Sequence, residues 1–95
     1  MAGKFNKYRL VDYFDVWGNE EEGYEVNNQC VIEDEITIAE NSTDDEILEY
    51  LSKTFGWLSE EAVKAGEITI ESQDDNWIEF IATNGYPLGR LEKIQ

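Results

Sequence analysis

The spacing of apolar residues changes twice along this chain, and these changes limit the folds that it can adopt. Residues 8–17 are rich in aromatic and β-branched side chains on both faces of a strand, and residues 24–32 alternate apolar and polar side chains. A turn bounded by Gly18 and Gly23 lies between them. We therefore expect a β-hairpin. A further alternating piece at residues 35–38 either prolongs its second strand or forms a short strand of its own.

A helical spacing replaces the alternation after residue 40. Thr43 and Glu46 have the spacing of a capping box, in which each side chain bonds to the backbone amide of the other residue. The apolar side chains then recur at helical spacing, at Ile47, Leu48, Leu51 and Phe55. This pattern predicts a helix over about residues 43–55, and Ser59 begins a second, shorter helix that ends near residue 65.

The alternation returns in the last third of the chain. We expect strands at about residues 68–70, 77–83 and 86–94, because apolar and β-branched side chains alternate there. Asn84-Gly85 is a strong signal for a hairpin turn between the last two strands. Pro87 cannot donate a ladder hydrogen bond, so it suggests that the last strand lies at an edge of the sheet.

Together these elements predict an α+β fold in the order ββ-α-α-βββ, as one compact acidic domain over residues 1–95. Its four- to five-stranded, mostly antiparallel sheet should have the helices on one face. The expected core consists of Leu10, Phe14, Val26, Ile47, Leu48, Leu51, Ile70, Ile78 and Phe80. Cys30 lies within a strand pattern without a nearby base, and we expect it to be a small buried hydrophobe.

Acidic residues are concentrated in the first half of the chain. The formal net charge is −15, and residues 10–52 contain fourteen acids and no Lys or Arg. Local ion pairs cannot neutralise such a segment, so some of these carboxylates must face solvent or a basic partner. Direct binding to nucleic acid is not expected, because contacts with phosphates need cations that this chain lacks.

Composition argues against several other classes of protein. A hydrophobic content of 41% predicts a folded chain, and no apolar run is long enough for a membrane span. The first residues lack the apolar stretch of a secretory signal, so we expect a cytoplasmic protein. With no His, one Cys and no calcium-loop pattern, we expect no catalytic residues, no metal, no cofactor and no enzymatic activity.

Carboxylates held on rigid elements can imitate the closely spaced phosphates of DNA. Same-face strand residues such as Glu33 and Glu35 lie about 6.6 Å apart, and the helical neighbours Asp45 and Glu49 about 5 to 6 Å apart. The candidate partner-binding surface consists of Glu20, Glu21, Glu22, Glu25, Glu33, Asp34, Glu35, Asp44, Asp45, Glu46 and Glu49.

Small size, strong acidity, absence of His and lack of a catalytic motif resemble the DNA-mimic inhibitors of phages and mobile elements, which include anti-restriction and anti-CRISPR proteins. The stretch YRLVDYFDVWGNEEEGYEVNN is also similar to short phage-encoded proteins. The resemblance implies binding to a basic, nucleic-acid-binding host protein and blocking of its groove. Two alternatives stay open: an interaction module that uses Tyr13, Trp17 and Tyr24 beside the acids, and an acidic surface that only faces solvent.

Overall fold

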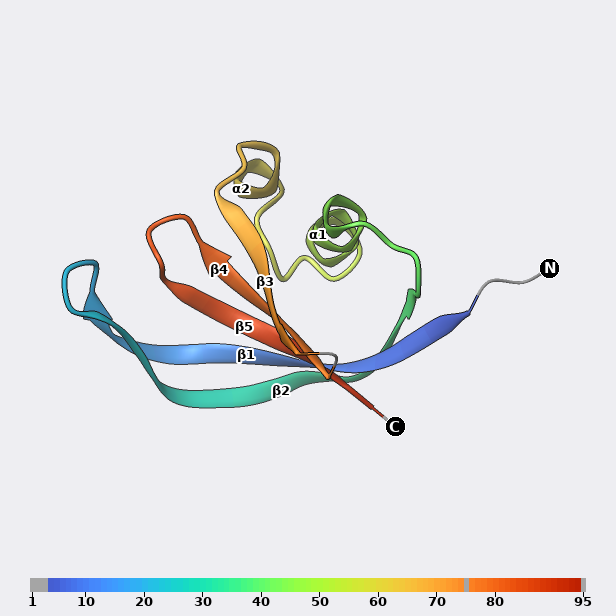
Figure 1. Ribbon diagram of the computed structural model, residues 1–95, viewed down its shortest axis with the longest axis horizontal. Helices are drawn as coiled ribbons and strands as arrows, with labels where there is room; N and C mark the ends of the chain where they lie inside the picture. The colour runs from blue at the N-terminus through green and yellow to red at the C-terminus, as the bar shows by residue number, and fades with distance from the viewer. Residues whose placement is uncertain (1–3, 75, 95) are drawn as a thin grey trace.

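The structure, a computed structural model that describes residues 4–74 and 76–94, confirms the predicted α+β fold (Figure 1). Two short helices lie on one face of a five-stranded antiparallel sheet with the strand order β2-β1-β5-β4-β3. The elements are β1 (Phe5–Asn19), β2 (Gly23–Ala39), α1 (Asp44–Lys53), α2 (Glu60–Lys64), β3 (Ile68–Asp74), β4 (Trp77–Ala82) and β5 (Pro87–Lys93).

The first two strands form a hairpin that is longer than predicted and that extends beyond the rest of the sheet (Figure 1). β2 continues through residues 35–38, so this alternating piece prolongs the second strand. β1 pairs with β5 only over residues 8–12, whereas its pairing with β2 continues to Asn19. We call residues 14–28, which lie past the β1–β5 pairing, the hairpin arm.

The core lies between the helices and the face of the sheet that they cover. α1 begins at the predicted capping box, with Thr43 as its N-cap, and turns Ile47, Leu48 and Leu51 toward the sheet. The largest fully buried side chains are Phe80, Leu10, Leu51 and Leu91. Of the other residues expected in the core, Ile70 and Ile78 are half-buried and pack against it.

Trp57, in the loop between the helices, attaches the helical layer to the sheet. Its indole packs edge-to-face on Phe80, with ring centroids 5.4 Å apart, and its Nε1–H donates to Asp12 Oδ1 at 2.8 Å. Gly89 in β5 leaves room for the ring, because a Cβ there would lie 2.5 Å from an indole carbon and would overlap the carbonyl oxygen of Val11.

The hairpin arm overturns two expectations about the core. Phe14 was expected to be buried, yet it is 60% exposed, and Val26 is only half-buried. Both lie past the last β1–β5 pair, and the register between β1 and β2 shifts between Asp12 and Asp15. No strand beyond the hairpin itself pairs with this segment within the described residues, so its apolar side chains have little to pack against.

Edge and interior positions also differ from the predictions. Cys30 is exposed, because it lies on β2, an edge strand whose only paired neighbour in the described chain is β1. Pro87 does not mark an edge, since β5 lies between β1 and β4. The proline is tolerated because it is the first residue of β5 and the pairing with β1 begins only at Gly89.

Candidate functional site

The turn of the hairpin arm presents the three glutamates of residues 20–22 to solvent at the far end of the hairpin (Figure 1). The backbone amide of Glu22 donates to Asn19 Oδ1 at 2.8 Å. Gly18 has a φ of +120°, and an added Cβ there would overlap the carbonyl oxygen of Gly23. Both features fix the turn, so these carboxylates are carried by a defined backbone.

Glu25 completes the acidic group at this end of the molecule. It is exposed and pairs across the hairpin with Trp17. We call Glu20, Glu21, Glu22 and Glu25 the tip acids. Within the residues that the structure describes, none of them forms an ion pair. Their charge is therefore available to a partner.

A network of hydrogen bonds holds Trp17 in place on the arm. The Asp15 carboxylate accepts from Trp17 Nε1 at 2.9 Å, from Asn27 Nδ2 at 2.8 Å and from Asn28 Nδ2 at 2.9 Å. The hydrogen bonds from Asn27 and Asn28 lower the pKa of Asp15 below its ordinary value of 3.8. Asp15 thus stays ionised at neutral pH and orients an indole that is 63% exposed.

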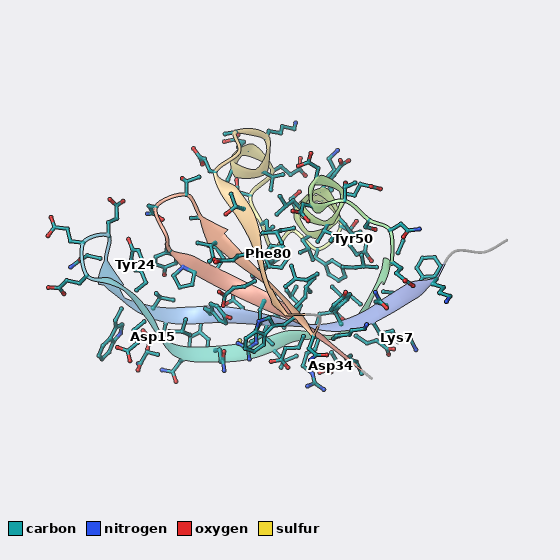
Figure 2. The ribbon with its side chains drawn as sticks, viewed as in Figure 1. Lys7, Asp15, Tyr24, Asp34, Tyr50 and Phe80 are labelled. Carbon is teal, nitrogen blue, oxygen red and sulfur yellow. The ribbon has the colours of Figure 1, made fainter. Side chains whose placement is uncertain are left out.

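Figure 2 shows Tyr24 pointing to the side of the sheet that carries the helices and Asp15 pointing to the other side. Side chains two apart on a strand share a face, and so do directly paired residues. Trp17, two residues from Asp15, and its partner Glu25 therefore lie on the face opposite the helices. We call this face the open face.

The acids of β2 form a second group, which is partly neutralised. Glu35 forms an ion pair with Lys7, with 3.0 Å between Oε1 and Nζ. Glu33 is half-buried opposite Leu10, whereas Asp34 is exposed. Only part of this group has the exposure and the unbalanced charge that a mimic surface needs.

The acids of α1 form a third group, and most of them serve the helix itself. Glu46 accepts hydrogen bonds from the Thr43 amide at 3.1 Å and hydroxyl at 3.0 Å. Lys53 donates to Glu49 at 2.9 Å, which raises the pKa of the lysine ammonium group. Asp44 and Asp45 are exposed in the first turn, where their negative charges interact favourably with the positive end of the helix dipole.

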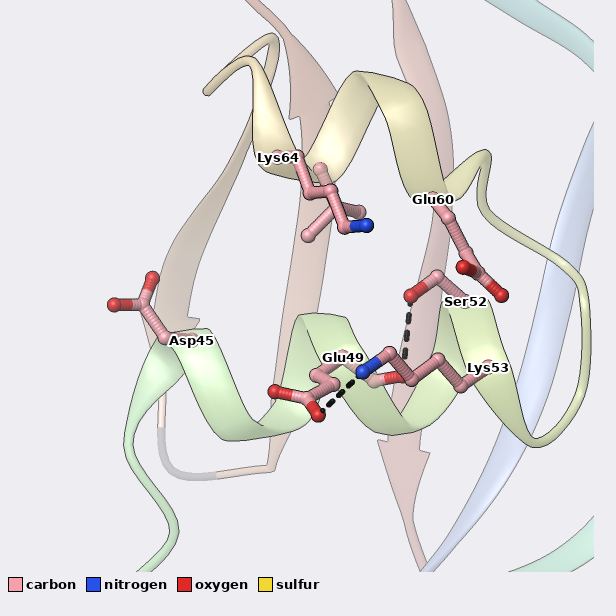
Figure 3. A pocket seen from close by; sticks show the side chains of 7 residues that line it. Asp45, Glu49, Ser52, Lys53, Glu60 and Lys64 are labelled. Atoms are coloured by element: carbon pink, nitrogen blue, oxygen red, sulfur yellow. Dashed lines mark hydrogen bonds and ion pairs between the residues drawn. The ribbon is translucent and has the colours of Figure 1, made fainter.

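A cavity of about 290 Å³ lies between α1 and α2 beside these acids (Figure 3). Asp45, Glu49 and Glu60 line it together with Lys53 and Lys64. The mixture of signs makes this groove a poor imitation of a polyanion, because each lysine would repel a basic partner.

The structure thus divides the predicted acidic surface into three groups. Glu25 and Glu33 are roughly 26 Å apart along β2, at about 3.3 Å per residue. α1 lies over the covered face of the sheet, whereas β2 is its edge and the arm extends beyond it (Figure 1). The tip acids are the group with the least internal compensation.

The aromatic residues considered for an interaction module differ in exposure. Tyr13 is 7% exposed. Tyr24 is half-buried and packs edge-to-face on Tyr86, with 5.2 Å between ring centroids. Trp17 alone of the three presents most of its side chain to solvent.

A cluster around Arg90 on the open face was missed by the sequence analysis. The guanidinium carbon lies 5.6 Å from the ring centroid of Tyr13 and 5.4 Å from that of Trp77. Arg90 also donates to Gln29 Oε1 at 2.6 Å and, through Nε, to Glu92 Oε1 at 2.9 Å. The cluster joins β2, β1, β5 and β4 and covers part of the face that has no helices.

Tyr13 is the buried hydroxyl of this cluster. It donates to Glu79 Oε2 at 2.9 Å and accepts from Arg90 Nη1 at 3.2 Å. Burial raises the pKa of Tyr13 above its ordinary value of 10.0, and the hydrogen bond from Arg90 partly opposes this effect. Alternation predicts that Arg90 and Leu91 point to opposite faces, but no local signal brings Tyr13, Glu79 and Gln29 to the same place.

The chain matches no protein-family model, no curated protein and no solved structure. Within residues 4–74 and 76–94, no group of three or more acidic or cysteine side chains is placed to hold a metal ion. Neither helix of these ranges has the length and apolar character needed to cross a bilayer.

Proposed function

We propose that this protein is a cytoplasmic binding inhibitor, and not an enzyme, that occupies the groove of a basic, nucleic-acid-binding host protein. It acts as a DNA or RNA mimic of phage or mobile-element origin, in the manner of anti-CRISPR proteins, and does not itself bind nucleic acid. The observation that carries the proposal is the group of tip acids, which a fixed turn presents to solvent without an ion-pair partner among the described residues.

The density of charge at the tip is comparable with that of a duplex. The pairs from Asn19↔Gly23 to Trp17↔Glu25, together with the turn, occupy about 10 Å of hairpin. Four carboxylates lie in this length, where duplex DNA presents about six phosphates at one per 1.7 Å of axis. A groove built to bind phosphates would therefore find a similar field at the tip.

The other acids take secondary parts in this proposal. Glu33, Asp34, Asp44 and Asp45 add to the long-range field that steers a basic partner toward the protein. Glu35, Glu46 and Glu49 are already engaged by Lys7, Thr43 and Lys53 respectively. A partner must break or share those contacts, so their contribution is smaller than that of the tip acids.

Affinity capture from a bacterial lysate tests the class of partner. The immobilised protein should retain basic, nucleic-acid-binding proteins, and duplex DNA or structured RNA added in excess should displace them. Binding should weaken steeply as salt rises, because exposed charges are screened within about 8 Å at physiological ionic strength. Capture that resists both salt and nucleic acid would contradict the proposal.

Charge reversal tests the location. Changing the three glutamates of residues 20–22 to Lys should leave the fold nearly intact, since exposed substitutions alter stability by about 0.5 kcal/mol. Capture should fall at least tenfold, roughly 1.4 kcal/mol. Asp45→Lys with Glu49→Lys should have a smaller effect. The matched control changes the exposed acids Glu60, Glu61 and Glu67 to Lys, with the same change in net charge; equal losses in tip and control variants would assign the effect to net charge alone.

A second candidate function rests on a different observation. Phe14 is 60% and Trp17 63% exposed on the arm. Large exposed aromatics anchor many protein interfaces, so the arm also suits an interaction module that does not imitate nucleic acid. In that case Phe14→Ser should abolish capture, whereas salt and competing DNA should have little effect.

A further inference from the structure

The exposure of Trp17 is the feature that the acidic surface alone does not explain. An indole that is 63% exposed gains little from burial, yet Asp15, Asn27 and Asn28 hold it in one orientation. Fixing a side chain costs conformational entropy, which a preorganised contact with a partner can offset. The ring is thus presented in the way that interface anchors are presented.

A groove of about 310 Å³ adjoins this indole at the tip of the arm. Its lining consists of Trp17, Gly18, Glu22, Gly23, Tyr24 and Glu25. The two glycines bring no side chains into the space and Tyr24 points to the side of the sheet that carries the helices, so the Trp17 indole and two carboxylates define the chemistry on the open face. Neither Glu22 nor Glu25 has an ion-pair partner among the described residues.

A guanidinium is already bound by aromatic rings and a carboxylate elsewhere on this sheet. On the open face, Arg90 places its guanidinium within 5.6 Å of the Tyr13 and Trp77 ring centroids and donates to the Glu92 carboxylate. Trp17 and Glu25 offer an aromatic ring and a carboxylate on that open face, at a place where no guanidinium is supplied by the described part of the chain.

We infer that the groove between Trp17, Glu22 and Glu25 receives an arginine side chain of the basic partner. The guanidinium stacks on the indole while the carboxylates accept its hydrogen bonds, which combines a cation–π contact with charge-assisted pairing. Arginine fits better than lysine, because the face of its planar guanidinium can stack on the indole while its N–H groups donate in the plane to the carboxylates. This inference rests on the proposed function and specifies how that basic partner is recognised.

Titration with short peptides tests the inference on the intact protein. The probe is a blocked peptide of alternating arginine and glycine, compared with peptides that carry lysine or the neutral isostere citrulline instead. Nuclear magnetic resonance follows the indole N–H signals, and Trp17→Phe assigns the one that belongs to Trp17. The arginine peptide should shift the Trp17 signal saturably and leave those of Trp57 and Trp77 in place; the lysine peptide should bind more weakly and the citrulline peptide not at all.

Variants locate the binding. Trp17→Leu removes the aromatic face and should weaken the arginine peptide by roughly two- to fivefold. The pair Glu22→Gln and Glu25→Gln should weaken it by roughly three- to tenfold, whereas the control pair Glu60→Gln and Glu61→Gln, with the same change in charge, should leave it unchanged. Unchanged Trp57 and Trp77 signals show that each variant is folded.

Several outcomes would overturn the inference. They are an unmoved Trp17 signal, equal shifts at all three indoles, equal binding of the citrulline peptide, or equal losses in the control pair. If the peptide fails while charge reversal of residues 20–22 still prevents capture of the partner, the mimic function holds without this groove. If the peptide binds as expected while that charge reversal, which includes Glu22, leaves capture unchanged, the groove binds arginine but not an arginine of the captured partner, and the mimic function is wrong.

Discussion

Replacing Gly89 by alanine tests how the helical layer is attached to the sheet. The new Cβ would overlap the carbonyl oxygen of Val11 and would lie 2.5 and 2.9 Å from two ring carbons of Trp57. The carbonyl belongs to β1, which is paired with β5 at this level. Both groups must therefore give way: the overlap with the carbonyl strains the β1–β5 pairing, and the overlap with the ring displaces the indole.

The structure sets the size of the effect. A displaced indole loses its hydrogen bond to the Asp12 carboxylate, worth about 1.5 to 3 kcal/mol, and its edge-to-face contact with Phe80, worth about 0.5 to 1.5 kcal/mol. The change to alanine also stabilises the fold by about 0.4 to 1 kcal/mol, because it lowers the conformational entropy of the unfolded chain. Together these terms lower the free energy of unfolding by about 1 to 4 kcal/mol, and the strain on the β1–β5 pairing adds to this loss.

Urea unfolding followed by far-ultraviolet circular dichroism measures this loss, with an unchanged m value as the check that the unfolded state is comparable. In a Trp57→Leu background the overlap with the ring is gone while the overlap with the Val11 carbonyl remains, so Gly89→Ala should cost about 1 kcal/mol less than in the parent but should still destabilise the fold. A Gly89→Ala variant within about 0.5 kcal/mol of the parent, or an equal cost in both backgrounds, would refute the reasoning.

Three further predictions concern the fold and its pH dependence. Phe80→Ala removes a fully buried ring and should lower the free energy of unfolding in urea by about 3 to 5 kcal/mol. Thr43→Ala should cost about 1 kcal/mol in the same assay, while Thr43→Ser keeps the cap. Because the pKa of Tyr13 is raised above 10.0, the folded state holds this proton more tightly, so its stabilisation is present below pH 10 and lost as pH rises through the raised pKa. Tyr13→Phe should remove that part of the alkaline loss, and identical profiles of unfolding free energy against pH would contradict it.

Local patterns were sufficient to predict the elements of this fold. The capping box at Thr43 and Glu46 is a short-range signal, and α1 begins where it indicates. Alternation located the strands, and Asn84-Gly85 located the turn before β5. These features depend on neighbours within a few residues, so they are accessible from sequence alone.

Whether a side chain is buried, and which face of the sheet it shares, was harder to predict from the sequence. Alternation placed Phe14 on a face of β1 but could not show that the arm extends past β5, so burial there was predicted wrongly. The tip acids were found because a turn between two glycines is a surface feature. The hydrogen bond from Trp17 to Asp15 joins residues two apart, but the bonds from Asn27 and Asn28 that fix Asp15 cross the hairpin at a shifted register, which no local pattern reveals.

The position of β5 has a consequence for the timing of folding. It is the fifth strand in chain order, yet it lies between β1 and β4, and Tyr8 pairs with Lys93. During synthesis the N-terminal hairpin and the β3–β4 ribbon therefore remain two separate ribbons until β5 has left the ribosome. The joining step needs contacts across almost the whole chain, and such steps are slow because loop closure precedes any gain from pairing. The inner edges of β1 and β4 stay open for that interval, so the nascent chain is most prone to aggregation just before its last strand inserts.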